Sequence, residues 1–128
     1  MAFLLDTHTF LWFVSGDNLL PKTVVKKIKN INEPCFLSSA SLWEITIKQQ
    51  LGKLILHVTL EELFEYAERN LIEIIPINTV HLLTLSELPF HHKDPFDRLI
   101  ISQAIAENLT LISKDESFKK YKVKQQWN

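Results

Sequence analysis

The chain has 128 residues, which suits one domain built around a single hydrophobic core. Hydrophobic residues make up 46% and charged residues 23%, with only two glycines and five prolines, which excludes a disordered or low-complexity protein. The net charge of −1 excludes a general attraction to nucleic acid, so contact with a polyanion requires a local basic patch.

Short apolar runs alternate with helical segments along the whole sequence. In chain order we predict a strand at 2–5, helices at 7–13 and 21–32, a strand at 35–37, helices at 39–50 and 60–70, a strand at 72–75, helices at 79–88 and 95–108, and strands at 109–112 and 122–124. This alternation predicts an α/β fold with a mainly parallel sheet, formed as a single domain over residues 1–128. Sites in such sheets lie beyond the carboxyl ends of the strands, where the strand order reverses.

The first predicted strand ends at Asp6, which places this carboxylate at the carboxyl edge of the sheet. Asp is also favoured as the N-cap of a helix, and the segment that follows Asp6 is helical. A ligand and a cap are equally consistent with this position.

The single cysteine, Cys35, cannot form an internal disulfide, and its apolar neighbours predict a buried thiol in a reducing, cytoplasmic setting. Residues 1–14 lack the basic region and the cleavage site of a signal peptide. No run approaches the roughly 18 apolar residues of a membrane span. One cysteine, without a helical pair of histidines, argues against a zinc site.

Glu44 lies in a strongly apolar helix, close to the line of Ala40 and Ile47 at about 100° per residue. A carboxylate on such a helix is not expected to be simply solvated. The alternative is an i,i+4 ion pair with Lys48, worth only about 0.2–0.5 kcal/mol when exposed. Because that pair is too weak to justify burying an acid, we favour a functional role for Glu44.

Two acids stand at the head of the helix predicted at 95–108. Asp94 precedes Pro95, the pattern of an N-cap followed by the first helical residue, so we expect Asp94 to cap the helix. Asp97 suits the helix dipole, but it shares a face with apolar residues, and we favour a ligand. Arg98 is expected either to neutralise one of these acids or to form a surface salt bridge.

Asp115 closely follows the strand predicted at 109–112, which again places a carboxylate at the carboxyl edge. Taken alone, Asp115 is best explained as the cap of a short turn at 116–119. Ser113 could hold a carboxylate or a metal-bound water, or it could cap the same turn, and neither role is favoured.

Lysines gather at two places in the sequence, and only the group near the C-terminus is considered as a contact for phosphates. The lysines of the second helix crowd one end of the molecule: Lys22, Lys26, Lys27 and Lys29. A second group could contact phosphates or form a solvated tail, with neither favoured: Lys119, Lys120, Lys122 and Lys124. Trp12 and Trp43 are expected to belong to the core rather than to a base-stacking surface.

Burying a charge is costly unless the charge is paired or bound to a metal, so several acids spread over one small domain indicate a cation that gathers them. Ligands that are all oxygen suit Mg²⁺ or Mn²⁺. These ions generate a hydroxide nucleophile and stabilise the leaving oxygen of a phosphoryl displacement. The predicted chemistry is metal-dependent hydrolysis of a phosphodiester.

Four segments, in this order and spacing, resemble the PIN-domain ribonucleases, specifically the small bacterial toxins of the VapC type. They are Leu5-Asp6-Thr7-His8 with Leu11-Trp12, Ser38-Ser39-Ala40-Ser41-Leu42-Trp43-Glu44-Ile45 with Lys48 and Gly52-Lys53-Leu54, His92-Lys93-Asp94-Pro95-Phe96-Asp97-Arg98 with Gln103-Ala104, and Leu111-Ile112-Ser113-Lys114-Asp115. The resemblance covers essentially the whole chain.

The resemblance implies a PIN-like three-layer sandwich, with a mainly parallel sheet of four or five strands flanked by helices. It implies that the catalytic, metal-binding residues for Mg²⁺ or Mn²⁺ are Asp6, Glu44, Asp97 and Asp115. Accessory candidates are Asp94, Thr7, Ser113 and Arg98. It further implies an endoribonuclease toxin that cuts RNA, commonly tRNA or ribosomal RNA, that a cognate antitoxin protein holds inactive, and that forms homodimers.

Two other functions compete with this one. An aspartyl-phosphate phosphatase needs a second Asp two residues after its nucleophile, and His8 occupies that position here. A catalytically silent PIN-fold interaction module is the remaining alternative, although all four acids of the family are present.

Overall fold

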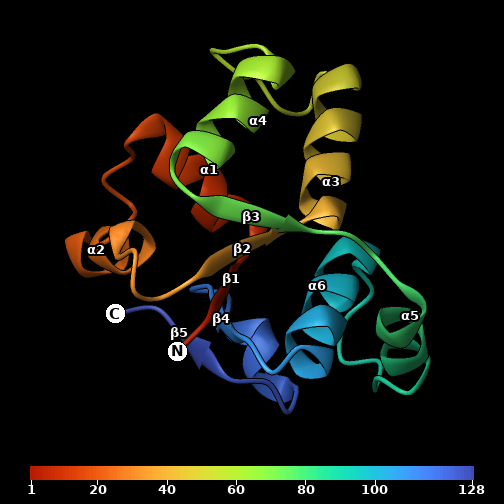
Figure 1. Cartoon of the computed structure of the whole chain (residues 1–128). Helices are drawn as coiled ribbons and strands as arrows, with labels where there is room; N and C mark the ends of the chain where they lie inside the picture. The colour runs from red at the N-terminus through yellow and green to blue at the C-terminus, as the bar shows by residue number, and fades with distance from the viewer.

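A five-stranded parallel sheet forms the centre of the computed structural model, which describes residues 1–128 (Figure 1). Its strands are β1 (Phe3–Leu5), β2 (Cys35–Ser38), β3 (Ile72–Ile75), β4 (Thr110–Ile112) and β5 (Gln125–Gln126), in the spatial order β3-β2-β1-β4-β5. The helices are α1 (Thr7–Ser15), α2 (Lys22–Lys29), α3 (Ser39–Gln50), α4 (Leu60–Arg69), α5 (Thr79–Ser86) and α6 (Pro95–Ala106), with a short 3₁₀ helix, η1 (Glu116–Lys120). None of them has the length and apolar content that crossing a membrane requires. The predicted α/β fold with a mainly parallel sheet of four or five strands is confirmed.

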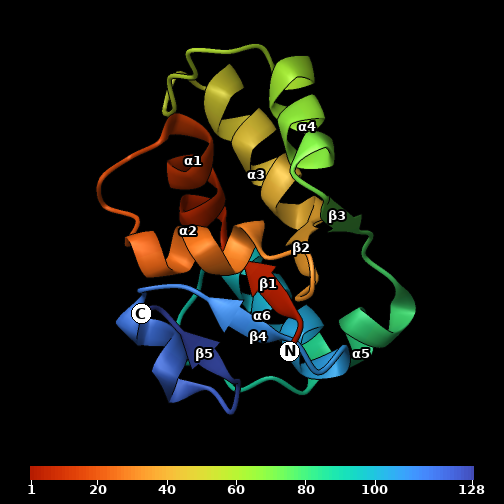
Figure 2. The same cartoon turned by 60° about the vertical axis from the view of Figure 1, so that its left-hand side comes forward.

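Helices cover both faces of the sheet, and successive strand residues point into two separate cores. Phe3 and Leu5 of β1 face the larger core, which α1, α2, α3 and α4 complete. Leu4, between them, faces the smaller core together with α6 and η1. This alternation is the two-residue period of a strand, and it produces the three layers seen in Figures 1 and 2.

The helix predicted at 21–32 is shorter in the structure. Pro21 occupies the N-cap position of α2, and the helix ends at Lys29. Asn30 leaves the helix, and its side chain accepts a hydrogen bond from the amide of Asn32. Such a local bond between an Asn side chain and the backbone offers the chain a turn in place of a further helical residue.

The last predicted strand, at 122–124, is wrong, because the strand lies directly after these residues. Val123 packs against the smaller core, and the parallel strand β5 follows it at Gln125–Gln126. Its pairing with β4 begins where Lys124 O accepts a hydrogen bond from Leu111 N. Two glutamines carry no apolar pattern, so the sequence does not indicate this strand. The other elements differ from prediction only at their ends.

The strand order reverses at β1. The chain passes from β1 outward to β2 and β3, and it then returns to place β4 on the other side of β1. Since all the strands are parallel, their carboxyl ends meet at one edge of the sheet. Helices α1 and α3 begin directly at that edge, and α6 packs against α3. Segments far apart in the sequence therefore supply residues to the same edge.

Phe10 on α1 tests this account of the larger core, because its ring is fully buried. We expect Phe10→Ala to lower the free energy of unfolding by about 3–5 kcal/mol, through lost burial and the cavity left behind. Urea denaturation followed by circular dichroism measures the change. Leu19→Ala, at a residue that is 54% exposed, is the control, with an expected change below about 1 kcal/mol. Equal losses in the two variants would contradict the packing of α1.

Candidate functional site

Five carboxylates from distant parts of the chain gather at the carboxyl edge of the sheet. Asp6 follows β1, Glu44 lies in the second turn of α3, Asp94 and Asp97 stand at the head of α6, and Asp115 follows β4. Asp97 shows the effect of this proximity. Its burial is the main cause that raises the pKa of its carboxyl group, and the charges of the other four acids raise it further. The structure thus brings together every acid that the sequence analysis singled out.

Asp6 is the N-cap of α1 and is also buried, with 7% of its surface exposed. Its Oδ1 accepts a hydrogen bond of 2.8 Å from the amide of Thr9. Burial raises the pKa of Asp6, and this effect outweighs the hydrogen bonds from Ser113 and Thr9, which lower it. The capping role, one of the two roles that the sequence left open for Asp6, is therefore present. The carboxylate is nevertheless held in a setting that disfavours its charge.

Glu44 is buried as predicted, with 3% exposure. Its Oε2 lies 2.6 Å from Lys48 Nζ, so the ion pair considered as the alternative is present. Its Oε1 lies 2.8 Å from Thr7 Oγ1, which lies 2.9 Å from Ser41 Oγ. Because a carboxylate only accepts hydrogen bonds, Thr7 donates to Glu44 and accepts from Ser41. Glu44 is therefore held at both oxygens.

Lys48 is the only cation that forms an ion pair with any of the five acids. Its hydrogen bond to Glu44 is the main cause that raises the pKa of the ammonium group, and the charges of Asp94 and Asp97 add to it. The Lys48 side chain remains 41% exposed. One paired cation leaves most of the negative charge at this edge uncompensated.

Asp94 caps α6 as predicted, since its Oδ1 accepts hydrogen bonds from Phe96 N at 2.9 Å and Asp97 N at 3.1 Å. The carboxylate of Asp97 itself accepts no hydrogen bond from the protein. Burial, followed by the charges of Asp94, Glu44, Asp6 and Asp115, raises the pKa of Asp97 to about 7. Asp97 is thus a carboxylate without a hydrogen-bond donor from the protein, in a setting that disfavours its charge.

Asp115 caps η1, because its Oδ1 accepts hydrogen bonds from both the amide and the hydroxyl of Ser117, at 2.9 and 2.7 Å. The capping role that the sequence favoured for Asp115 is therefore confirmed. Ser113 Oγ is buried and accepts a hydrogen bond of 3.1 Å from Asp115 N. Ser113 thus lies between Asp115 and Asp6.

Both roles expected for Arg98 are wrong. Its guanidinium is buried and donates to the carbonyl oxygens of Pro89 and Leu88, at 2.8 and 3.2 Å. It also lies 3.8 Å from the centroid of the Phe90 ring. A rotation of about 100° per residue turns Arg98 away from the face that carries Asp97. Arg98 therefore fixes the loop before α6 and meets no carboxylate.

Trp43 is not a core residue, contrary to expectation, because 57% of its surface is exposed. Its ring meets the ring of Phe96 edge to face at 5.3 Å, beside the acids of α3 and α6. Ser41 is a contact that the sequence analysis did not single out. Its position three residues before Glu44, on the same side of α3, is the signal that was available.

The residues at this edge fit a hard divalent cation by their chemistry. No group of three or more His, Cys, Asp or Glu side chains converges closely enough to form a ready-made site. The caps occupy only one oxygen each of Asp94 and Asp115, however, and Asp97 accepts no hydrogen bond, so free carboxylate oxygens remain. Oxygen ligands supplemented by water are the set that Mg²⁺ and Mn²⁺ accept.

Comparison with known proteins bears on the whole chain. The sequence model of a family described as PIN domain matches residues 3–124. No curated protein sequence matches the chain.

Several solved structures share the fold. VapBC2 from Rickettsia felis, crystallised with a DNA fragment from its promoter, is similar with a TM-score of 0.77 and 21% identity over 100% of both chains. DNA-bound VapBC from Salmonella typhimurium gives a TM-score of 0.73 and 16% identity, over 100% of this chain and 99% of the other. VapBC-1 from nontypeable Haemophilus influenzae gives a TM-score of 0.68 and 17% identity, over 98% of this chain and 97% of the other. At these identities the likeness concerns the fold.

The raised pKa of Asp97 predicts how metal-free stability depends on pH. Its ordinary pKa of 3.8 becomes about 7 in the folded state, so stability is expected to fall as pH rises through this range. We expect Asp97→Asn, in EDTA, to be more stable than the wild type by about 1–2 kcal/mol at pH 8, a value discounted for partial exposure. The difference should vanish near pH 4. Urea denaturation across this range measures it.

Glu65→Gln, at an exposed position on α4, is the matched control and should behave like the wild type at each pH. A metal-free Asp97→Asn protein that is less stable than the wild type at pH 8 would show that Asp97 contributes favourable contacts instead of repulsion.

Proposed function

Because this chain belongs to the PIN-domain family, we propose that it is a Mg²⁺- or Mn²⁺-dependent endoribonuclease and the toxin of a toxin–antitoxin pair. PIN domains are typically nucleases, and residues 1–128 would form one such domain. The observation that carries the proposal is the carboxylate of Asp97. Its burial and the charges of four neighbouring acids raise its pKa to about 7. Such a concentration of like charge is unfavourable for the metal-free fold and becomes useful once a cation is bound.

We assign the metal to Asp6, Glu44, Asp97 and Asp115. A bound Mg²⁺ or Mn²⁺ would supply a hydroxide nucleophile at neutral pH and offset charge on the phosphodiester. Thr7 and Lys48 hold the two oxygens of Glu44 in place, and Ser113 orients Asp6.

Asp94 is an accessory residue in this proposal. It fixes the first turn of α6 through two backbone amides and so sets the position of Asp97. Arg98 acts at a distance, by holding the carbonyl groups of the loop that leads into α6. Neither residue is assigned to the metal.

RNA is the proposed substrate because the sequence motifs resemble those of VapC-type toxins, for which tRNA and ribosomal RNA are common targets. The cognate partner is proposed to be an antitoxin protein, in line with the VapBC complexes that share the fold. Exposed apolar side chains support protein partners, including a second copy of this chain. They occur on the α3–α4 connection and on α5: Leu51, Ile55, Val58, Val80, Leu82 and Leu83.

Metal binding should be visible without any substrate. We expect Mn²⁺ or Mg²⁺ to raise the melting temperature of the wild type, since a ligand at 100 times its Kd adds about 2.7 kcal/mol of stability. The increment should grow from pH 6 to pH 8, because a cation competes with the proton on Asp97. Asp97→Asn should lose most of the increment, and Glu65→Gln should keep it. An increment of equal size in Asp97→Asn would remove this residue from the metal site.

Cleavage of RNA is the direct test. Purified protein, free of any partner, should cut RNA in Mg²⁺ or Mn²⁺, and EDTA should abolish the activity. Asp97→Asn should lower the rate on the order of 100-fold or more, because altering even the partners of metal ligands costs 10- to 100-fold. Sequencing of the RNA ends reports the cuts. Equal cleavage in EDTA would refute the metal mechanism.

The catalytically silent PIN-fold interaction module is the remaining alternative. It would be favoured if the protein cut no RNA in total cellular RNA and if its overproduction, without a partner, left growth normal. Retention of the metal-induced rise in melting temperature would then indicate a binding role for the same acids.

A further inference from the structure

Aromatic side chains lie beside the acidic edge, on the side of α1. The ring centroids of His8 and Trp12 are 5.8 Å apart, and Trp12 meets Trp127 at 6.0 Å. Lys114, directly before Asp115, places its Nζ 5.4 Å from the centroid of the Trp12 ring. His8 is exposed and Trp12 is partly exposed. Aromatic rings inclined to one another, with a nearby cation, thus adjoin the acids.

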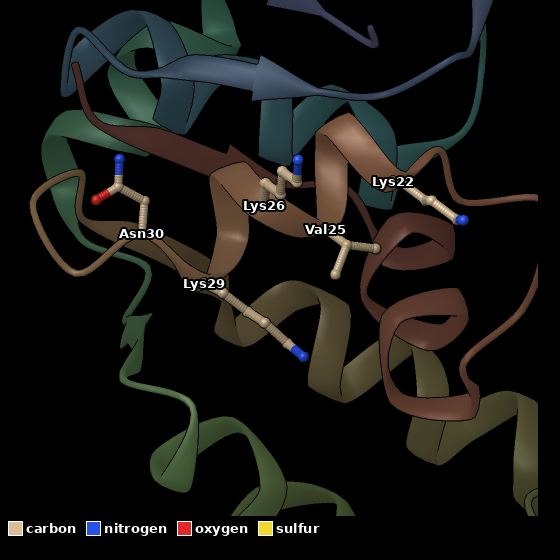
Figure 3. A pocket seen from close by; sticks show the side chains of 5 residues that line it. All are labelled: Lys22, Val25, Lys26, Lys29 and Asn30. Carbon is tan, nitrogen blue, oxygen red and sulfur yellow. The ribbon is translucent and has the colours of Figure 1, made fainter.

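Trp12 also lines a cavity on the side of α2. A cavity of about 400 Å³ between α1 and α2 has Trp12, Lys22 and Lys29 in its wall. A second cavity of about 440 Å³ on α2 shares Lys22, Val25 and Lys29 with the first and adds Lys26 (Figure 3). The two cavities adjoin one another at these three residues, and we refer to them together as the groove. None of the five acids of the candidate site lines either cavity.

The lysines of this groove are exposed and free of ion pairs. Lys22, Lys26 and Lys29 follow one another at four and three residues, which places them on one side of α2 over about 10 Å. None of them, and not Lys114, forms a salt bridge. Asp17 is the only acid in the walls of the two cavities. The exposed lysines therefore place local positive charge on a chain of net charge −1, over cavities whose walls are also partly apolar.

We propose that these residues, the aromatic–lysine track of Trp12, Lys22, Lys26, Lys29 and Lys114, bind the single strand of RNA that leads to the acidic edge. Trp12 stacks on a base and the lysines contact successive phosphates, the combination by which proteins hold single strands with little sequence preference. The inference rests on the proposed nuclease function and adds positioning residues to it. The track supplies the attraction for a polyanion that the acidic edge lacks.

A single strand fits this surface better than a duplex or a protein segment. The bases of a duplex are stacked on one another and cannot offer a face to Trp12. An acidic protein segment would be attracted to the lysines, but unlike a single strand it does not carry a base beside every charge to meet the ring of Trp12 next to Lys114. The repeating charge and unpaired bases of RNA match both parts of the track.

Binding can be measured without cleavage, in EDTA and in an Asp97→Asn background, with a fluorescein-labelled 12-nucleotide RNA of mixed sequence. We expect Lys22→Ala/Lys26→Ala/Lys29→Ala to weaken binding at least 10-fold near 0.1 M salt. The slope of log affinity against log salt should become shallower by about 2, since each phosphate contact contributes about 0.7 for a single strand. The same oligonucleotide as a duplex, and an acidic peptide of equal charge, serve as comparison ligands.

Four further variants separate charge, position and stacking. The Lys→Arg triple at positions 22, 26 and 29 keeps the charge and should bind like the parent protein. Lys53→Ala, on the exposed α3–α4 connection, should also leave binding unchanged. Trp12→Phe should bind nearly as the parent does, and Trp12→Leu should lose about 5-fold or more. Because Trp12 packs against the larger core, circular dichroism must first show that each variant is folded.

Unchanged affinity and salt slope in the folded lysine-to-alanine triple would overturn the track. So would a triple that loses only the acidic peptide, since the groove would then serve a protein partner. RNA cleavage is measured in a separate assay, with the same lysine variants made in the protein that retains Asp97. Cleavage with unaltered binding in the triple refutes the track alone. Loss of binding in a protein that never cuts RNA refutes the nuclease alone.

Discussion

Repulsion among carboxylates at one edge of a parallel sheet is the constraint on which the arrangement of this molecule depends. Parallel strands deliver the residues that follow them to the same edge, so Asp6 and Asp115 lie near one another although 109 positions separate them. The packing of α3 against α6 adds Glu44 and Asp97. Local contacts offset part of this repulsion. Backbone amides at the starts of helices donate hydrogen bonds to Asp6, Asp94 and Asp115, and Lys48 pairs with Glu44.

The capping role and the ligand role of these acids turn out not to exclude one another. Asp6, Asp94 and Asp115 each cap the start of a helix, as their sequence contexts suggest. A cap fixes one carboxylate oxygen against backbone amides and places the charge near the positive end of the helix dipole. The other oxygen remains available. Capping is therefore a means of aiming a carboxylate across the edge, and Asp97, which caps nothing, is the acid that the others surround.

The sequence was informative wherever a local pattern controls the outcome. Most strand and helix positions and the burial of Glu44 follow from periodicity, and the caps follow from the residue types at the helix starts. It was uninformative where a distant segment decides. Arg98 is satisfied by carbonyl groups of Pro89 and Leu88, and β5 is a short edge strand that pairs with β4. Trp43 is largely exposed, and its ring meets Phe96 of another helix at the surface.

The hydroxyl of Thr7 has a consequence for how this protein can change over generations. It satisfies a buried oxygen of Glu44 across 37 residues of sequence and is itself satisfied by Ser41. Losing that hydroxyl would leave a carboxylate oxygen buried without a donor, which is more costly than the loss of an exposed hydrogen bond. A substitution at one of these three positions is therefore expected to require a substitution at the others. Among descendants of this chain, Thr7, Ser41 and Glu44 should be inherited or replaced as one unit.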